Sequence, residues 1–175
     1  MDKTDINWIK VYTIARQTTI DHYSRQFHFK LTHHILYLNK SLTNMRILNN
    51  RLCSFCDLEE ETPIHLFAQC RIIVSLWDSL RLLFQDEIEI PDLTSQSAIL
   101  GFYEINENRI ILNQILLAFR MFVYKAREIK TGTLARVVGK LKLIKTIEDQ
   151  ISNGDERKRN YNSQKWAGVR TILKP

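Results

Sequence analysis

Residues 52–70 read LCSFCDLEEETPIHLFAQC and contain all three cysteines of the chain together with one of its five histidines. Cys53, Cys56, His65 and Cys70 form the spacing C-x2-C-x8-H-x4-C. Three thiolates and one imidazole are a ligand set of closed, four-coordinate structural zinc sites. The gap of two residues lets a tight turn direct the first two sulfurs toward one ion. The sequence therefore predicts a structural Zn²⁺ site with these four ligands.

Two other interpretations of the cysteines were weighed against zinc. Free cysteines are often ordinary buried side chains, but chance would scatter three of them rather than cluster them with a histidine at ligand spacing. A disulfide between Cys53 and Cys56 would leave Cys70 without a partner. Disulfides are also typical of secreted proteins, and nothing in the sequence indicates secretion.

A short helix is expected to carry the last two ligands. Thr62 can cap its N-terminus, and Pro63 suits the first helical position because its missing N–H has no helical partner there. His65 then lies on the first turn. Cys70 follows about a turn and a half later, at the helix end.

The composition favours helices. Five glycines and three prolines in 175 residues, of which 45% are hydrophobic, leave few helix breakers. We predict an all-α protein, a helical bundle with an inserted CCHC zinc-binding loop at residues 53–70. Residues 1–152 form the helical domain in this division, and residues 153–175 form a basic C-terminal tail.

Apolar spacing predicts the individual helices. A first helix, capped by Asp5, would place Trp8, Ile9, Tyr12 and Ala15 on one buried face. A long helix from about residue 108 to 129 is apolar nearly all round, which indicates burial on more than one side. A last long helix begins after a Thr133 cap, directs Ile151 toward the core and ends at residues 153–154. Residues 85–98 are predicted to be a loop.

The net charge of +6 is unevenly distributed. Residues 1–52 hold eight Lys and Arg against three Asp and Glu, residues 53–108 hold two against eleven, and residues 109–175 hold fifteen against five. The acidic run within the predicted zinc loop should repel phosphate groups. We therefore expect the zinc to stabilise the fold, and the basic C-terminal part to provide the contacts with phosphates.

The C-terminal residues combine positive charge with the aromatic side chains Tyr161 and Trp166, which can stack on unpaired bases. A charged cluster at a chain end is about equally often a solvated tail, and Trp166 could instead dock the tail on the core. The candidate nucleic-acid contacts are Arg157, Lys158, Arg159, Lys165, Lys140, Lys142 and Lys145.

Residues 52–70 resemble the zinc-binding segment at the C-terminal end of reverse transcriptases from non-LTR (LINE-type) retrotransposons. The resemblance extends to residues 27–36 (FHFKLTHHIL) with Asn39 and Lys40, to Trp77 and Leu80, and more weakly to residues 99–101 (ILG). It implies binding of RNA and/or DNA. It also implies the upstream reverse transcriptase part, or another protein, as a second partner.

Three classes of function were compared. The first is a non-catalytic nucleic-acid-binding zinc domain. The second is a zinc-stabilised scaffold that docks on a polymerase or another protein without binding nucleic acid. An enzyme is not expected, because no Asp-Asp dipeptide is available for catalytic magnesium and a four-ligand zinc has no open position for water.

The sequence also gives expectations about location. No apolar run approaches the roughly 18 residues that a membrane span needs, so no membrane partner is expected. The first residues are polar and carry no signal-peptide pattern. We therefore expect an intracellular protein, in the nucleus or the cytoplasm.

Overall fold

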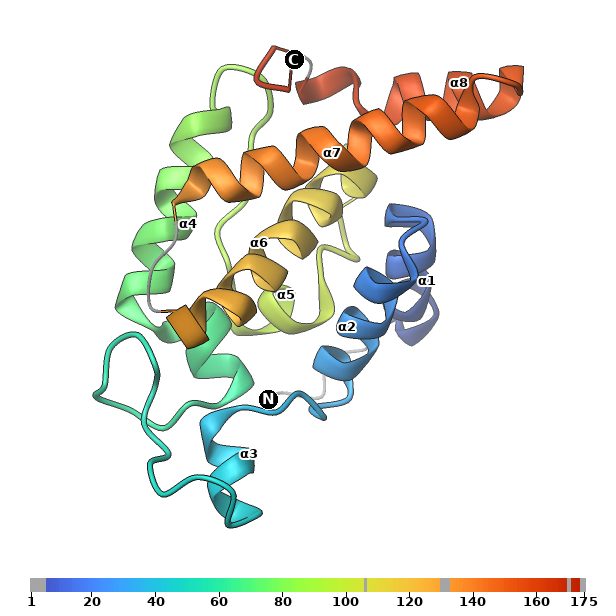
Figure 1. The fold of residues 1–175 in the computed structure, drawn as a ribbon. Helices are drawn as coiled ribbons and strands as arrows, with labels where there is room; N and C mark the ends of the chain where they lie inside the picture. Colours follow the sequence, from blue (N-terminus) through green and yellow to red (C-terminus); the bar gives the residue numbers. More distant parts are fainter. Residues whose placement is uncertain (1–5, 106, 130–132, 170, 174–175) are drawn as a thin grey trace.

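The computed structural model describes residues 6–105, 107–129, 133–169 and 171–173, with the side chains of 128–129 excepted. These residues are mainly helical and contain no strand, only an isolated antiparallel bridge between Leu52 and Glu60. The prediction of a mainly helical protein is confirmed for this part of the chain (Figure 1). The helices are α1 (Trp8–Thr18), α2 (His22–Thr32), α3 (Asn39–Asn44), the π-helix η1 (His65–Gln69), α4 (Arg71–Phe84), α5 (Ser95–Leu100), α6 (Arg109–Ile129), α7 (Leu134–Ser152), α8 (Glu156–Lys165) and the 3-10 helix η2 (Ala167–Val169).

Helix α6 forms the centre of the fold. Every residue from 111 to 121 is buried, and the helix contacts α1, α2 and α7. Figure 1 shows α6 between α4 on one side and α1 and α2 on the other. The rings of Trp77 and Phe119 meet edge to face at 5.0 Å and join α4 to α6. The predicted long helix, buried on more than one side, is confirmed.

A fully buried arginine links three helices. Arg120 of α6 donates to the carbonyl oxygens of Ala98 and Ile99, at the C-terminal end of α5, at 3.2 and 3.1 Å. The partial negative charge of that helix end offsets the guanidinium charge. Burial lowers the pKa of Arg120 to about 9, so the side chain stays charged at neutral pH. Burial and the nearby Arg120 lower the pKa of His28 to about 3, so His28 is neutral there.

The buried face of α1 differs from the prediction. Trp8, Ile9 and Tyr12, which we expected inside, are 46%, 79% and 53% exposed. The helix begins after an Asn7 cap and buries Ala15, as predicted, but together with Val11, Ile14 and Thr18. Both faces of α1 carry apolar side chains, and packing against α6 and α2 buries the one without the large rings. The predicted Asp5 cap lies outside the described residues.

The predictions for two further helices had different outcomes. Helix α5 begins at Ser95, inside the stretch predicted to be a loop, with a capping box between Thr94 and Ser97. Helix α7 starts after Thr133 and ends at Ser152, as predicted. Ile151, expected in the core, is 56% exposed.

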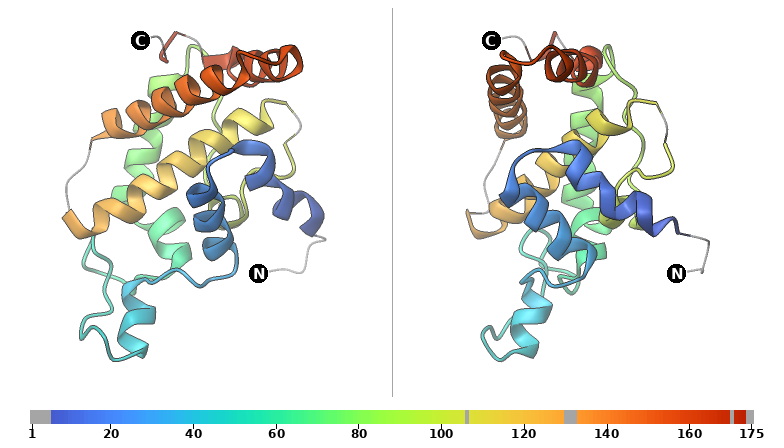
Figure 2. Two further views of the ribbon diagram at one scale, coloured as in Figure 1. Left: turned by 45° about the vertical axis from the view of Figure 1, so that its right-hand side comes forward. Right: turned by 90° about the vertical axis from the view of Figure 1, so that its right-hand side faces the viewer.

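The described residues of the segment assigned to a basic tail, 153–169 and 171–173, pack against the rest of the fold. Helix α8 contacts α7, and both lie together in all three views of the ribbon (Figures 1 and 2). Trp166 is 2% exposed, and its Nε1 donates to Glu148 and Asn162 at 2.9 and 3.0 Å. Trp166 thus docks on the core and cannot stack on a base from this position.

Gly101 gives a test of the packing around α5. Its φ of +86° and ψ of 177° fall in a region that side chains other than glycine avoid. An added Cβ would lie 2.6 Å from Asn113 Oδ1, which accepts the N–H of Phe102. Gly101→Ala should therefore lower the free energy of unfolding by about 2–4 kcal/mol.

The matched control is Gly139, in the interior of α7. An added Cβ there has no atom within 4 Å, so Gly139→Ala should raise the free energy of unfolding by about 0.5–1 kcal/mol. Urea unfolding followed by circular dichroism measures both. Equal effects of the two substitutions would contradict the assigned backbone at Gly101.

Candidate metal centre

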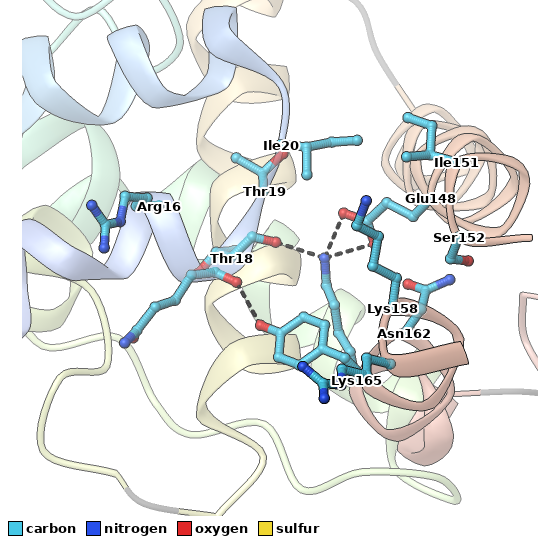
Figure 3. Close-up of a pocket in the computed structure, with 13 residues that line it drawn as sticks. Arg16, Thr18, Thr19, Ile20, Glu148, Ile151, Ser152, Lys158, Asn162 and Lys165 are labelled. Carbon is cyan, nitrogen blue, oxygen red and sulfur yellow. Dashed lines mark hydrogen bonds and ion pairs between the residues drawn. The ribbon is translucent and has the colours of Figure 1, made fainter. Parts of the chain in front are cut away.

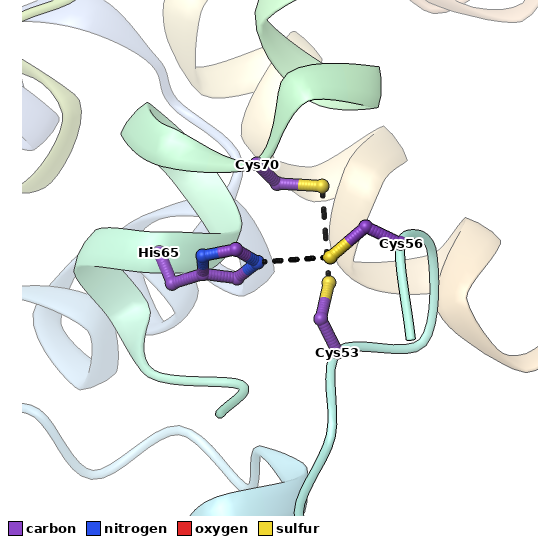
Figure 4. Close-up of side chains that lie close together, drawn as sticks. All are labelled: Cys53, Cys56, His65 and Cys70. Carbon is purple, nitrogen blue, oxygen red and sulfur yellow. Dashed lines mark hydrogen bonds between the residues drawn. The ribbon is translucent and has the colours of Figure 1, made fainter. Parts of the chain in front are cut away.

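The structure brings the four predicted ligands together (Figure 4). One ligand atom from each of Cys53, Cys56, His65 and Cys70 can be chosen so that all lie within 4.8 Å of one another. The sulfurs of Cys53 and Cys70 are 3.8 Å apart, and Cys56 Sγ is 3.3 Å from His65 Nε2. Zinc–sulfur bonds of about 2.3 Å in a tetrahedron separate two sulfurs by about 3.8 Å. The four side chains are therefore close enough to bind a metal ion.

A tight turn presents the first two sulfurs. The N–H of Asp57 donates to the carbonyl of Cys53 at 2.9 Å, and the N–H of Cys53 donates to the carbonyl of Glu59 at 2.8 Å. Asp57 has a φ of +53°, a left-handed conformation that aspartate tolerates better than most residues. The chain reverses here between Leu52 and Glu60, so Cys53 and Cys56 face the same side. All three cysteines are free of disulfides.

The other two ligands lie on a short helical segment that begins as predicted. Pro63 is its first helical residue, and the Thr62 hydroxyl accepts the N–H of His65 at 3.0 Å. The N–H of Cys70 donates to the carbonyl of His65 at 2.7 Å, five residues back. In an α-helix these two side chains would point about 140° apart. The π-helical turn brings them to the same side.

The pKa shifts of two cysteine thiols bear on whether the cluster can bind a cation. The hydrogen bond from Cys53 lowers the pKa of the Cys70 thiol to about 7, and backbone N–H groups of Ile72 and Ile73 act in the same direction. The same bond, together with burial, raises the pKa of Cys53. Cys70 also occupies the N-cap of α4, where the helix dipole favours a negative charge. A thiolate is thus accessible near neutral pH, and a bound cation would displace the remaining thiol protons.

Glu59 is a neighbour of the cluster that the sequence reasoning missed. Its Oε2 lies 3.2 Å from His65 Nδ1, although that nitrogen makes no hydrogen bond of good geometry. Carboxylates in this position orient the imidazole of many metal-binding histidines. Glu59 lies in the Leu52–Glu60 reversal and His65 in the helical segment that follows, so no local pattern linked the two.

Glu61 connects the metal cluster to the centre of the fold. It is 0% exposed and accepts the N–H of Ser54 at 2.8 Å and that of Asn39 at 3.0 Å. It also forms an ion pair with Arg127, near the C-terminal end of α6. Burial alone raises the pKa of Glu61, but the Ser54 N–H, the Arg127 charge and the Asn39 N–H together keep it below its usual value.

The acidic run of the loop is therefore mostly paired within the protein. Glu60 lies 2.7 Å from Lys40 and 2.8 Å from Arg51, Glu61 is buried, and Glu59 faces His65. Glu60 and Glu61 thus pair with basic side chains of the protein, whereas Glu59 stays 69% exposed, so the negative charge of this surface is reduced but not removed.

The predicted phosphate contacts differ in their exposure and in their pairing with acidic side chains. Arg157, Lys158 and Arg159 are exposed on α8, with Lys158 at 3.7 Å from Asp155. Lys145 of α7 lies 2.6 Å from Asp149, which reduces its free charge. The remaining α7 candidates, Lys140 and Lys142, are half-buried.

The prediction that Lys165 contacts phosphate is corrected by its burial. It is 7% exposed, and its Nζ lies 2.8 Å from both carboxylate oxygens of Glu148 and 2.6 Å from the carbonyl of Thr18 (Figure 3). Burial lowers its pKa, while Glu148 opposes that shift. Because these acceptors occupy the ammonium, Lys165 fastens α8 to α7 and α1 and is not available to a phosphate.

A cleft of about 400 Å³ lies beside this ion pair, between the end of α1, the end of α7 and α8. We call it the α7–α8 cleft (Figure 3). It is lined by Arg16 from α1 and by Arg157 and Lys158 from α8. Glu148 is the one acidic residue among its lining side chains, and Lys165 neutralises it. Arg16 was not among the predicted contacts, because no sequence signal links it to residues 157–158.

No family model, no curated protein and no solved structure matches this chain. In the described part of the chain, no helix is both long and apolar enough to cross a membrane.

The Glu61–Arg127 pair gives a test of the link between the metal cluster and α6. Removing one partner of a buried ion pair leaves an uncompensated charge, so Glu61→Gln and Arg127→Met should each cost about 3 kcal/mol of unfolding free energy. The double variant should cost clearly less than their sum. The lowered pKa keeps Glu61 charged above the pKa of an unfolded glutamate, so its contribution is complete at pH 7 and is lost as the pH falls through its folded-state pKa.

The measurement is a double-mutant cycle from urea unfolding at pH 7, with metal content checked for each variant. Glu60→Gln is the neighbouring control, because Glu60 is 38% exposed and its ion pairs lie at the surface. It should change the free energy of unfolding far less. Strictly additive effects of the Glu61 and Arg127 substitutions would contradict the coupling.

Proposed function

We propose that this chain is a non-catalytic domain that binds nucleic acid, RNA and/or DNA, through its basic side chains. In this proposal a zinc ion bound by the Cys3His cluster stabilises a helical bundle. The resemblance of residues 52–70 to the C-terminal zinc-binding segment of LINE-type reverse transcriptases is consistent with this role. A cluster with four protein ligands leaves no open position for catalysis on the metal.

The observation that carries the proposal is the convergence of three cations on the α7–α8 cleft. Arg16 precedes Arg157 and Lys158 by more than 140 residues, yet all three line one cleft. The one carboxylate of that lining, Glu148, is already paired with Lys165. Cations that are close together and lack a competing acid in the lining attract phosphate groups.

The zinc cluster contributes to this function indirectly. It lies near α3 and its following loop, at one end of the molecule, whereas α8 lies at the other end in all views (Figures 1 and 2). The loop presents the exposed carboxylate of Glu59 and the partly exposed one of Glu60, which do not attract phosphate groups. The metal therefore stabilises the scaffold, and the phosphate contacts lie elsewhere.

A second candidate function is supported by a separate observation. Leu143, Ile147 and Ile151 follow one another at intervals of four along α7 and are 53%, 41% and 56% exposed. An exposed apolar stripe of this kind is typical of a protein interface. A docking module for a polymerase or another protein would use this stripe and would not need the cations.

The experiment that tests the proposal measures binding to fluorescein-labelled RNA by anisotropy at several salt concentrations. The triple variant Arg16→Gln, Arg157→Gln and Lys158→Gln should weaken binding and reduce the slope of log K against log salt by about 2–3. The matched control neutralises Arg46, Arg71 and Arg136, which are exposed outside the cleft, and changes the net charge equally. Equal losses in both triple variants would contradict a specific phosphate site and would leave only non-specific attraction.

A further inference from the structure

Four aromatic rings form a continuous, solvent-facing row across α1 and the end of α2. Trp8 stacks on Tyr12 with ring centroids 5.7 Å apart, and Tyr12 stacks on His33 at 5.7 Å. Phe29 packs against His33 at 4.2 Å. Trp8, Tyr12 and Phe29 are each about half exposed, at 46%, 53% and 53%. We call these four rings the aromatic row.

On each of the two helices, an arginine lies on the same face as the aromatic side chains. Trp8, Tyr12 and Arg16 are spaced by four along α1, and Phe29 and Arg25 are spaced by four along α2. Residues four apart lie on one face of a helix. Each helix therefore presents a line of side chains that is aromatic at one end and cationic at the other.

A second cleft lies between these two lines. It has a volume of about 210 Å³, and we call it the α1–α2 cleft. Its lining contains no acidic residue and consists of Tyr12, Ala15, Arg16, Arg25, His28, Phe29 and Thr32. Arg25 is fixed in the wall because its Nε donates to the carbonyl of Thr19 at 2.7 Å.

The charge around the cleft is strongly one-sided. Between residues 6 and 40 the chain has five Lys and Arg but one acidic residue, Asp21. The Asp21 carboxylate is used as the cap of α2, where it accepts the N–H groups of Tyr23 and Ser24. No carboxylate therefore competes for an anion among the lining residues.

We propose that the α1–α2 cleft and the aromatic row bind a single-stranded nucleic acid, with bases stacked on the rings of Tyr12 and Phe29 and a phosphate held by Arg16 and Arg25. This deepens the proposed function and depends on it, because it specifies the strandedness of the ligand. Exposed rings beside cations match the two chemical parts of an unpaired nucleotide. A duplex keeps its bases stacked internally and would leave the rings unused.

The two clefts are adjacent because Arg16 lines both of them. A single strand can therefore follow the surface from the cations of α8 to the rings of α1 and α2. Charge complementarity favours this ligand over an apolar protein segment. A purely apolar partner would gain nothing from Arg16 and Arg25.

The test compares an unstructured single-stranded oligonucleotide with a hairpin duplex of equal phosphate number. Tyr12→Ala and Phe29→Ala should each weaken binding of the single strand by about tenfold, leave duplex binding unchanged and leave the salt slope unchanged, because stacking releases no counterions. Tyr37→Ala is the matched control, since Tyr37 is 57% exposed and lines neither cleft.

A second readout keeps the test independent of variant stability. Trp77 and Trp166 are each 2% exposed, so base stacking should quench mainly the emission of Trp8. The single strand should quench the wild-type protein, and Trp8→Phe should lose that response. If the wild type binds both ligands but the ring variants and Trp8 emission do not respond to the single strand, the stacking site is wrong while the proposed function stands. If the wild type binds neither ligand, both proposals fail.

Discussion

The convergence of Cys53, Cys56, His65 and Cys70, close enough to bind one metal ion, is the constraint on which this end of the molecule depends. The chain from α3 to Glu60 contributes little to the hydrophobic core, because Cys53 is the only buried residue between positions 39 and 60. Met45, Ile47 and Leu58 are 55%, 64% and 65% exposed, and α3 has no buried residue. Burial of apolar surface therefore contributes little to holding the loop after α3 in place. A bound ion would join the Cys53–Cys56 turn to the His65–Cys70 helical turn, which the buried Leu66 and Phe67 anchor in the core.

Glu61 extends this local constraint to the rest of the fold. It is bonded on one side to Ser54, within the Cys53–Cys56 turn, and on the other to Arg127 of α6. Arg127 also donates to the carbonyl of Tyr37 at 3.0 Å. The Cys3His cluster and the central helix are thus connected through one buried carboxylate and one arginine. The proposed nucleic-acid clefts lie on α1, α2 and α8. The Cys3His cluster and the proposed phosphate contacts therefore occupy different parts of the chain.

The sequence predicted local features better than their arrangement. The ligand set, the Thr62 cap and the long buried helix follow from spacing and apolar periodicity, which are local properties. The predicted buried face of α1 was wrong because Trp8 and Tyr12 have the hydrophobicity of core residues. Only the packing of α1 on α6 decides which apolar face is covered. Lys165 was misassigned for a similar reason, since its partner Glu148 lies on another helix. The meeting of Arg16 with Arg157 is a tertiary contact that no local pattern encodes.

X-ray absorption spectroscopy at the zinc edge, on protein purified without added metal, tests the central claim most directly. The account predicts one zinc per chain, with three sulfur neighbours at about 2.3 Å and one nitrogen at about 2.0–2.1 Å. Removal of that zinc by a chelator should then reduce the helical circular dichroism signal and the unfolding temperature. A metal-free protein that is fully folded, or a zinc bound mainly by oxygen, would contradict the account.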